Sequence, residues 1–201
     1  MNKGSISLQD TDADDTLVRA AADGDRPAFD DLVRRHQDRV FNLCVWFLSD
    51  YQEADDMAQE VFIKAFRSLK SFRFEAKFST WLYRVAVNTC KNRVNSLEYR
   101  IKKWTDRLDT GDMNPGDAAD EDHSSQTFSP QEHLEKKEKM QQIQKAVNGL
   151  SGDKKAVILM RDIEGLSYDE ISRITGLSLG TVKSKIARAR MELQLQLKDM
   201  I

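Results

Sequence analysis

Residues 165–190 read GLSYDEISRITGLSLGTVKSKIARAR, and their pattern predicts the fold of the C-terminal part of the chain. Ser167 and Glu170 have the spacing and the residue types of a capping box, which predicts the start of a short helix. Gly176 supplies a left-handed stop for that helix, and Ser178 predicts the N-cap of a final one. Two helices joined by a tight turn that contains glycine indicate a helix-turn-helix.

The last helix of this motif carries a basic face. Val182, Ile186 and Ala189 recur at helical spacing and predict the buried side, so the basic residues project outward. A lysine contacts phosphate as a point charge, whereas an arginine can donate two hydrogen bonds to a guanine edge. The pattern indicates a DNA-reading helix, with a basic surface helix that binds nothing as the alternative. The outward basic residues are Lys183, Lys185, Arg188 and Arg190.

Two more helices are expected upstream, in a C-terminal domain that spans residues 130–199. Ser129 and Pro130 open the first, which ends at Gly149, and Ser151 caps the second. The inward residues are expected to be Leu134, Met140, Ile143, Ala146 and Val147 in the first helix, and Ala156, Val157, Leu159 and Met160 in the second.

An N-terminal domain of amphipathic helices is expected over residues 12–106. Asp25 caps the first helix, the second starts near Asp50, and Ser79 caps the third. Residues 70–78 break the apolar periodicity and predict a loop. The stripes predict a small packed bundle, whose core includes Phe29, Leu32, Val40, Leu43, Cys44, Phe47, Ala54, Met57, Ala58, Val61, Phe62, Ala65, Phe66, Leu69, Leu82, Ala86 and Cys90.

Charge is distributed unevenly along this nearly neutral chain. The net charge is −5 over residues 1–31, −3 over 32–61, +9 over 62–107, −7 over 108–138 and +4 over 139–201. Clustered lysine and arginine indicate a polyanionic partner, although mixed charges can also simply solvate helix faces.

Two segments are expected outside the domains. Residues 1–11 are a tail, and residues 107–129 form an acidic stretch with few apolar residues and no periodicity. Such a stretch cannot bury enough surface to offset its ordering entropy, so it predicts a flexible linker.

Composition excludes several classes of protein. The chain has 201 residues, no run of eighteen apolar residues that could span a membrane, and an acidic N-terminus unlike a signal peptide. Its two cysteines lie in apolar helical patterns, which predicts neither a disulfide nor a metal site and favours a reducing cytoplasm. His36 has no evident partner, and no arrangement of carboxylates or nucleophiles indicates a catalytic site or a cofactor.

Three stretches together resemble one family. They are Asp56-Met-Ala-Gln-Glu-Val-Phe-Ile-Lys-Ala-Phe66, Phe78-Ser-Thr-Trp-Leu-Tyr-Arg-Val-Ala-Val-Asn88, and the helix-turn-helix quoted above. In this order they resemble the extracytoplasmic-function group of bacterial RNA polymerase sigma factors. The resemblance implies an all-α chain of two small helical domains, similar to sigma-2 and sigma-4, with no enzymatic activity of its own.

The resemblance also implies three binding surfaces. Matched position by position, Asp56, Gln59 and Glu60 dock on core polymerase, and their spacing places them on one helical face. The duplex −35 element is read by Thr181, Lys183, Ser184, Lys185, Ala187 and Arg188. The melted −10 element is held by Lys70, Phe72, Arg73, Phe74, Lys77, Arg84, Asn88 and Asn92, through stacking, amide hydrogen bonds and backbone contacts.

The sequence therefore predicts a sigma factor that binds core polymerase and promoter DNA, with an anti-sigma protein as a further implied partner. Trp81 fits either the core stripe or a melting aromatic. The main alternative function is a stand-alone helix-turn-helix regulator, which would need neither the acidic face nor the aromatic loop.

Overall fold

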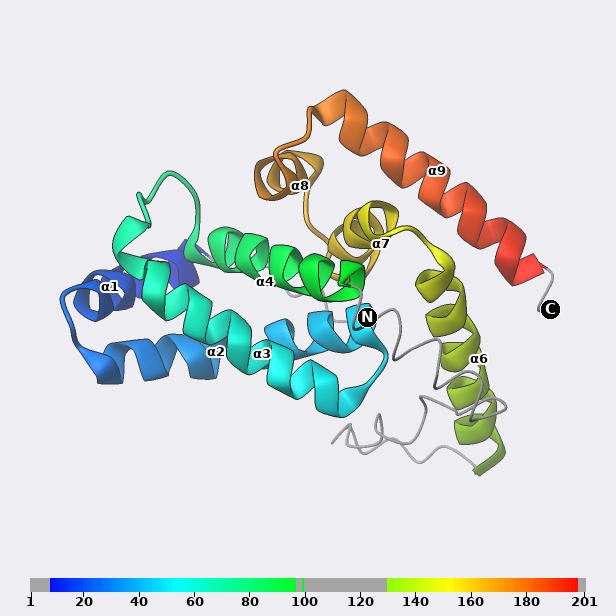
Figure 1. Ribbon diagram of the computed structural model, residues 1–201, viewed down its shortest axis with the longest axis horizontal. Coiled ribbons are helices and arrows are strands. Elements are labelled where there is room, and N and C mark those ends of the chain that lie inside the picture. Colours follow the sequence, from blue (N-terminus) through cyan, green and yellow to red (C-terminus); the bar gives the residue numbers. More distant parts are fainter. Residues whose placement is uncertain (1–7, 97–98, 100–129, 199–201) are drawn as a thin grey trace.

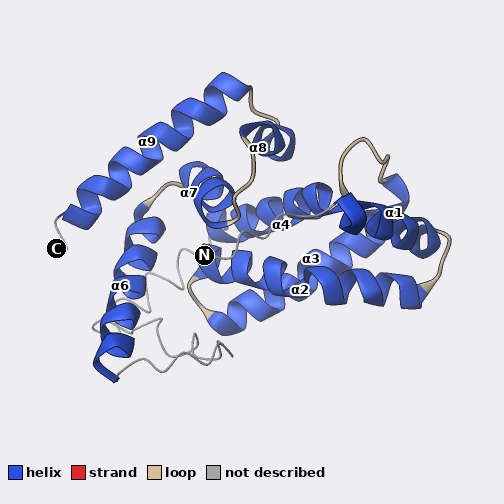
Figure 2. Cartoon of the chain, turned by 180° about the vertical axis from the view of Figure 1, so that it is seen from behind, coloured by secondary structure: helices blue, strands red, loops and turns tan. Residues whose placement is uncertain are grey.

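The computed structural model describes residues 8–96, 99 and 130–198, and all secondary structure within these ranges is helical (Figures 1 and 2). Helices α1–α4 form one group and α6–α9 a second (Figure 1). Within the described ranges, no helix is both long and apolar enough to cross a bilayer. The predicted linker over 107–129 lies outside the described residues.

The first group contains α1 (Leu8–Ala22), α2 (Arg26–Leu48), α3 (Tyr51–Ser68), the 3-10 turn η1 (Leu69–Ser71) and α4 (Phe78–Asn95). The predicted Asp25 cap of α2 and the predicted start of α3 near Asp50 are confirmed, and Asp50 is itself the N-cap of α3. Asp25 accepts a hydrogen bond from the Ala28 amide at 3.3 Å, and Asp50 accepts one from the Glu53 amide at 2.9 Å. Helix α1 begins inside the stretch that the sequence assigns to the tail.

The predicted Ser79 cap of α4 is wrong. Lys77 takes the cap position, and its side chain makes no capping hydrogen bond. The helix starts at Phe78, whose ring is only 1% exposed. Burial of this ring in the core, rather than a hydroxyl cap, therefore determines where the helix begins.

Most of the predicted stripe residues form the core of this group, but Phe62 is half-buried against it and Phe66 is exposed. Phe66 is 46% exposed and contacts the Phe29 ring edge-on, 4.9 Å between centroids. Cys44 and Cys90 are fully buried, as predicted, with their sulfurs 3.6 Å apart and no disulfide between them. Trp81 is half-buried beside the core aromatics, so both of its predicted roles stay open.

His36 does have a partner. Its Nε2 lies 2.8 Å from an Asp14 carboxylate oxygen, and this buried pair ties α1 to α2. The same carboxylate contacts the Arg35 guanidinium at 3.2 Å. His36 and Asp14 are 22 positions apart in the sequence, so their spacing did not indicate that they form a pair.

The second group contains α6 (Pro130–Gly149), α7 (Gly152–Ile158), the π-helical turn η2 (Leu159–Ile163), α8 (Tyr168–Thr175) and α9 (Leu179–Lys198). The capping box of α8 is confirmed: the Ser167 hydroxyl accepts from the Glu170 amide, and the Glu170 carboxylate accepts from the Ser167 amide. Gly176 ends α8 in the left-handed region, at φ +72°.

Two details of this group differ from the prediction. Ser151 stands at the N-cap of α7, but its side chain makes no capping hydrogen bond. Met140 and Ile143, predicted to point inward from α6, are 46% and 39% exposed. Among the α6 side chains that the structure describes, from residue 138 onward, those of Ala146 and Val147 are buried, and the predicted inward residue Leu134 lies outside the described side chains.

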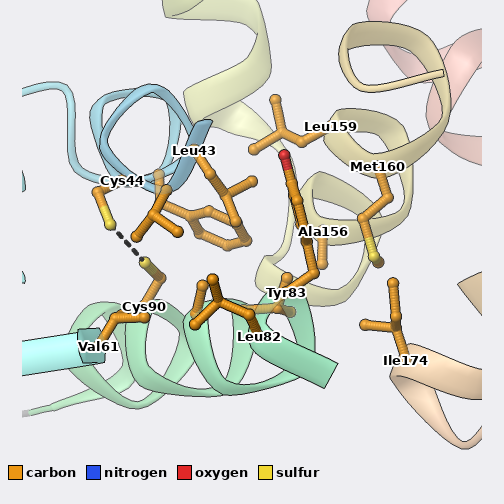
Figure 3. Close-up of a cluster of buried hydrophobic side chains, with 14 of the residues drawn as sticks. Leu43, Cys44, Val61, Leu82, Tyr83, Cys90, Ala156, Leu159, Met160 and Ile174 are labelled. Atoms are coloured by element: carbon orange, nitrogen blue, oxygen red, sulfur yellow. Dashed lines mark hydrogen bonds between the residues drawn. The ribbon is translucent and has the colours of Figure 1, made fainter. Parts of the chain in front are cut away.

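The two groups pack directly against each other. Figure 3 shows Leu43, Leu82 and Tyr83 of the first group meeting Ala156, Leu159, Met160 and Ile174 of the second. The buried Lys155 ammonium donates to the Phe47 carbonyl at 2.9 Å and so joins α7 to α2. The sequence predicts two domains on a tether, and it does not predict this shared core because its residues resemble ordinary core-stripe residues.

Candidate nucleic-acid interface

Helix α9 presents most of its predicted DNA-reading residues to solvent. Val182, Ile186 and Ala189 are buried, so the opposite side of the helix is turned outward. Thr181 is half-buried, and its hydroxyl lies 2.8 Å from that of Ser178. The exposed members of the set are Lys183, Ser184, Ala187 and Arg188.

Lys185 differs from the rest of this set. It is half-buried, and its ammonium lies 3.0 Å from the Asp153 carboxylate of α7. Asp153 also pairs with Lys91 of α4 at 2.5 Å. Hydrogen bonds from Lys91 and then Lys185 lower the pKa of Asp153. One carboxylate therefore links the α9 reading helix to the first helical group.

Helix α4 presents the predicted polar stripe. Arg84, Asn88 and Asn92 follow one another at intervals of four residues, and all three are exposed. The Arg84 guanidinium donates a hydrogen bond to the Arg173 carbonyl of α8. The two asparagines are thus open to solvent, whereas Arg84 lies at the contact between the two groups.

The loop before α4 contains two phenylalanines that are both predicted to contact the −10 element, but they differ in burial. Phe72 is 8% exposed, and its ring lies edge-on to that of Phe78 with 6.1 Å between the centroids, so Phe72 belongs to the core. Phe74 is 36% exposed at the surface. Lys70 and Arg73 are exposed as well, so a partly exposed aromatic residue and two cations of this segment lie at the surface.

Lys77, at the end of this loop, faces the second helical group. It lines a cleft of about 220 Å³ together with Tyr83, Glu164 and Glu170. The Tyr83 hydroxyl donates to Glu164 at 2.5 Å, and burial together with this carboxylate raises the Tyr83 pKa. In this arrangement Lys77 faces acidic side chains of the chain itself.

Helix α3 carries the predicted acidic face. Asp56, Gln59 and Glu60 are exposed, and Met57 and Val61 are buried on the other side. The side chains are held along the helix: Gln59 donates to Asp55 at 2.9 Å, and Glu60 pairs with Lys64 at 2.6 Å.

The sequence pattern did not predict an apolar patch that lies beside this acidic face. Ile63 and Phe66 are 49% and 46% exposed, and they follow Gln59 and Glu60 by one or two helical turns. Helical spacing assigns Phe66 to the core stripe, so the apolar periodicity predicted a buried side chain where the structure has an exposed one. The exposed α3 surface therefore carries both acidic and apolar side chains. Protein interfaces combine an apolar centre with a polar rim.

Comparison with known families matches both helical groups. Residues 32–98 match the family described as sigma-70 region 2, and residues 140–193 match sigma-70 region 4. The chain is 36% identical to the RNA polymerase sigma-H factor of Pseudomonas aeruginosa, over 94% of this chain and 95% of that protein. It is also 36% identical to the ECF RNA polymerase sigma-E factor of Escherichia coli K12, over 94% of this chain and 96% of that protein.

A solved structure also has a similar fold. The structure of CnrH in complex with the cytosolic domain of CnrY aligns with a TM-score of 0.66 and 25% identity, covering 93% of this chain and 98% of that one.

Proposed function

The chain belongs to the extracytoplasmic-function group of RNA polymerase sigma factors, and we propose that each of three surfaces binds a different target during transcription initiation. As an alternative sigma factor it directs promoter-specific transcription initiation. The unit over residues 12–106 binds core polymerase and the −10 element, the unit over 130–199 binds the −35 element, and 107–129 joins them.

The proposed −35 surface is the exposed side of α9. Lys183 and Arg188 have no ion-pair partner among the described residues, so their charges are available to phosphate and base edges. The buried side of the helix at Val182 and Ile186 fixes its orientation. Lys185 reaches DNA only after it leaves Asp153.

The proposed −10 surface combines the loop with the outer stripe of α4. Melted bases are held by stacking on exposed aromatics and by hydrogen bonds to their edges. Phe74 supplies the exposed ring, and Asn88 supplies both an amide donor and an acceptor for an extruded base. Lys70 and Arg73 supply backbone contacts.

The proposed polymerase surface is the exposed side of α3. Its acidic residues Asp56 and Glu60 suit a basic partner surface, and Ile63 adds apolar area that becomes buried on docking. This mixed face is the observation that carries the proposal, because a regulator that only binds duplex DNA does not need it.

A charge reversal on α3 tests the proposal. Glu60→Lys leaves the fold nearly intact because the side chain is exposed, and we expect it to abolish binding to core polymerase by placing like charges together. Asp38→Lys, exposed on α2, is the matched control and should bind normally. A folded Glu60→Lys protein that still binds polymerase and supports runoff transcription would show that this face of α3 is not the polymerase-docking surface.

We further propose an anti-sigma protein as a partner. The relative CnrH was solved in complex with the cytosolic domain of CnrY, and this chain aligns over 93% of its length with that bound form. The chain itself carries out no reaction in this scheme; the polymerase supplies the chemistry, in the cytoplasm where the promoter lies.

A further inference from the structure

Phe74 in the proposed −10 loop has an unusual backbone conformation. Its φ is +56°, in the left-handed region that bulky side chains rarely adopt. Among the described residues, Ser49 is the other non-glycine residue with positive φ, and it ends α2, where this conformation is common. Phe74 ends no helix, so surrounding contacts must hold it in place.

Two contacts hold the Phe74 ring. The Arg19 guanidinium carbon lies 4.3 Å from the ring centroid, a cation–π contact that reaches from the last turn of α1. The Phe72 ring meets it edge-on at 4.8 Å, and Phe72 is itself buried against Trp81. Phe74 as a whole residue still keeps 36% of its surface exposed, so part of it is open to solvent beside these two contacts.

We infer that Arg19 is a positioning residue for −10 recognition, which acts by holding the Phe74 ring in the orientation that receives a melted base. The inference rests on the proposed −10 role of this loop. Arg19 lies more than 50 positions before Phe74 in the chain and outside the three motifs that indicate the family. Its role follows only from the contact between α1 and the loop.

Arg19 is not needed to hold α1 in the fold. The helix is fixed by Val18 and Ala21, which are 1% and 5% exposed, and by the buried pair of Asp14 with His36. Arg19 itself is exposed. Its removal should therefore release the Phe74 ring without releasing the helix, which separates a positioning role from a structural one.

The test uses holoenzyme reconstituted from the full chain and core polymerase, with two DNA probes. One is a fork-junction DNA whose −10 segment is single-stranded, and the other is a duplex that carries only the −35 element. We expect Arg19→Ala to weaken fork-junction binding by about three- to tenfold, with unchanged −35 binding and melting temperature. Arg19→Lys should recover part of the loss because an ammonium also contacts an aromatic face.

A double-mutant cycle then identifies the route of the effect. If Arg19 acts through the ring, Arg19→Ala should cost little further affinity in a Phe74→Ala background. Arg34→Ala is the matched control, because Arg34 is an exposed arginine paired within its own helix, and it should bind both probes normally.

The outcomes separate this inference from the proposed function. Loss of fork-junction binding in Phe74→Ala together with normal binding by Arg19→Ala would overturn the inference alone. Equal losses from Arg19→Ala in the presence and absence of Phe74 would also overturn it. Normal binding by Phe74→Ala would remove both the proposed stacking role of the loop and the inference built on it.

Discussion

The two proposed DNA-reading regions are built on different physical bases. Helix α9 is one continuous helix whose buried side, at Val182 and Ile186, determines what its other side presents. The −10 loop has no regular structure between η1 and α4, and its shape depends on contacts with α1 and the core. A reading surface on a helix can therefore be derived from periodicity, whereas a reading surface on a loop requires the tertiary structure.

The largest expected effect divides the loop itself into a core residue and a surface residue. Phe72→Ala should lower the free energy of unfolding by about 3 kcal/mol, because it removes a nearly buried ring from a packed aromatic cluster. Phe74→Ala should lower it by less than about 1 kcal/mol, because the residue is already one-third exposed. Urea unfolding of both variants measures the difference. Equal losses of stability would mean that the two rings are not divided in this way.

The next effect concerns the outer stripe of α4. Asn88→Ala removes an exposed amide, so stability should hold while discrimination between −10 sequences falls by about 1–3 kcal/mol. Transcription from a series of −10 variants measures this loss, and binding to −35 duplex should not change.

Asn42→Ala, an exposed asparagine on α2, is the control for that experiment and should leave promoter choice intact. If Asn88→Ala keeps the same preference among −10 variants as the unmodified chain, then the stripe on α4 does not read bases.

The contrast between the helix and the loop also explains which features of the fold and the site could be predicted from the sequence. The capping box at Ser167, the stop at Gly176 and the exposed side of α9 depend on neighbours a few residues away. The structure has them as predicted, except that Thr181 and Lys185 on α9 are half-buried. The start of α4 depends instead on burial of the Phe78 ring, and the role of Phe72 depends on packing against distant residues. Sequence spacing carries no signal for such contacts.

The contact between the two helical groups shows the same limit. Tyr83 reads as one more residue of an amphipathic helix, yet its hydroxyl reaches Glu164 in the second group, 81 positions away. Asp153 reads as a solvated acid at the start of α7, yet it joins lysines from α4 and α9. The Tyr83–Glu164 and Asp153–Lys91 contacts require the two groups to be brought together, which local patterns do not encode.

A smaller effect separates two lysines on α9. Lys183→Ala should weaken −35 duplex binding and lower the slope of log affinity against log salt concentration by about 1, because an available phosphate contact is lost. Lys185→Ala should change both quantities less, because its ammonium is already paired with Asp153 in the free chain. Salt titrations of duplex binding measure both slopes. A larger loss from Lys185→Ala would show that the Asp153 pair does not hold in solution.

The smallest effect concerns Asp153, which joins the regularly built α9 to the first helical group. Asp153→Asn removes the charge that engages Lys91 and Lys185, so −35 duplex affinity should rise by about twofold while unfolding stability falls by less than about 1 kcal/mol.

The lowered pKa of Asp153 sets how the stability difference between the original chain and Asp153→Asn depends on pH. A carboxyl with a lowered pKa in the folded state stabilises above its ordinary pKa, so the loss of stability should be complete at neutral pH. As the pH falls below the ordinary aspartate pKa of about 4 the stability difference should shrink, and the two proteins should converge only below the lowered folded-state pKa, where the original carboxyl is protonated. Asp38→Asn, exposed on α2, should show neither change. Urea unfolding at several pH values checks this, and a stability difference that persists at low pH would mean that Asp153 acts through packing rather than charge.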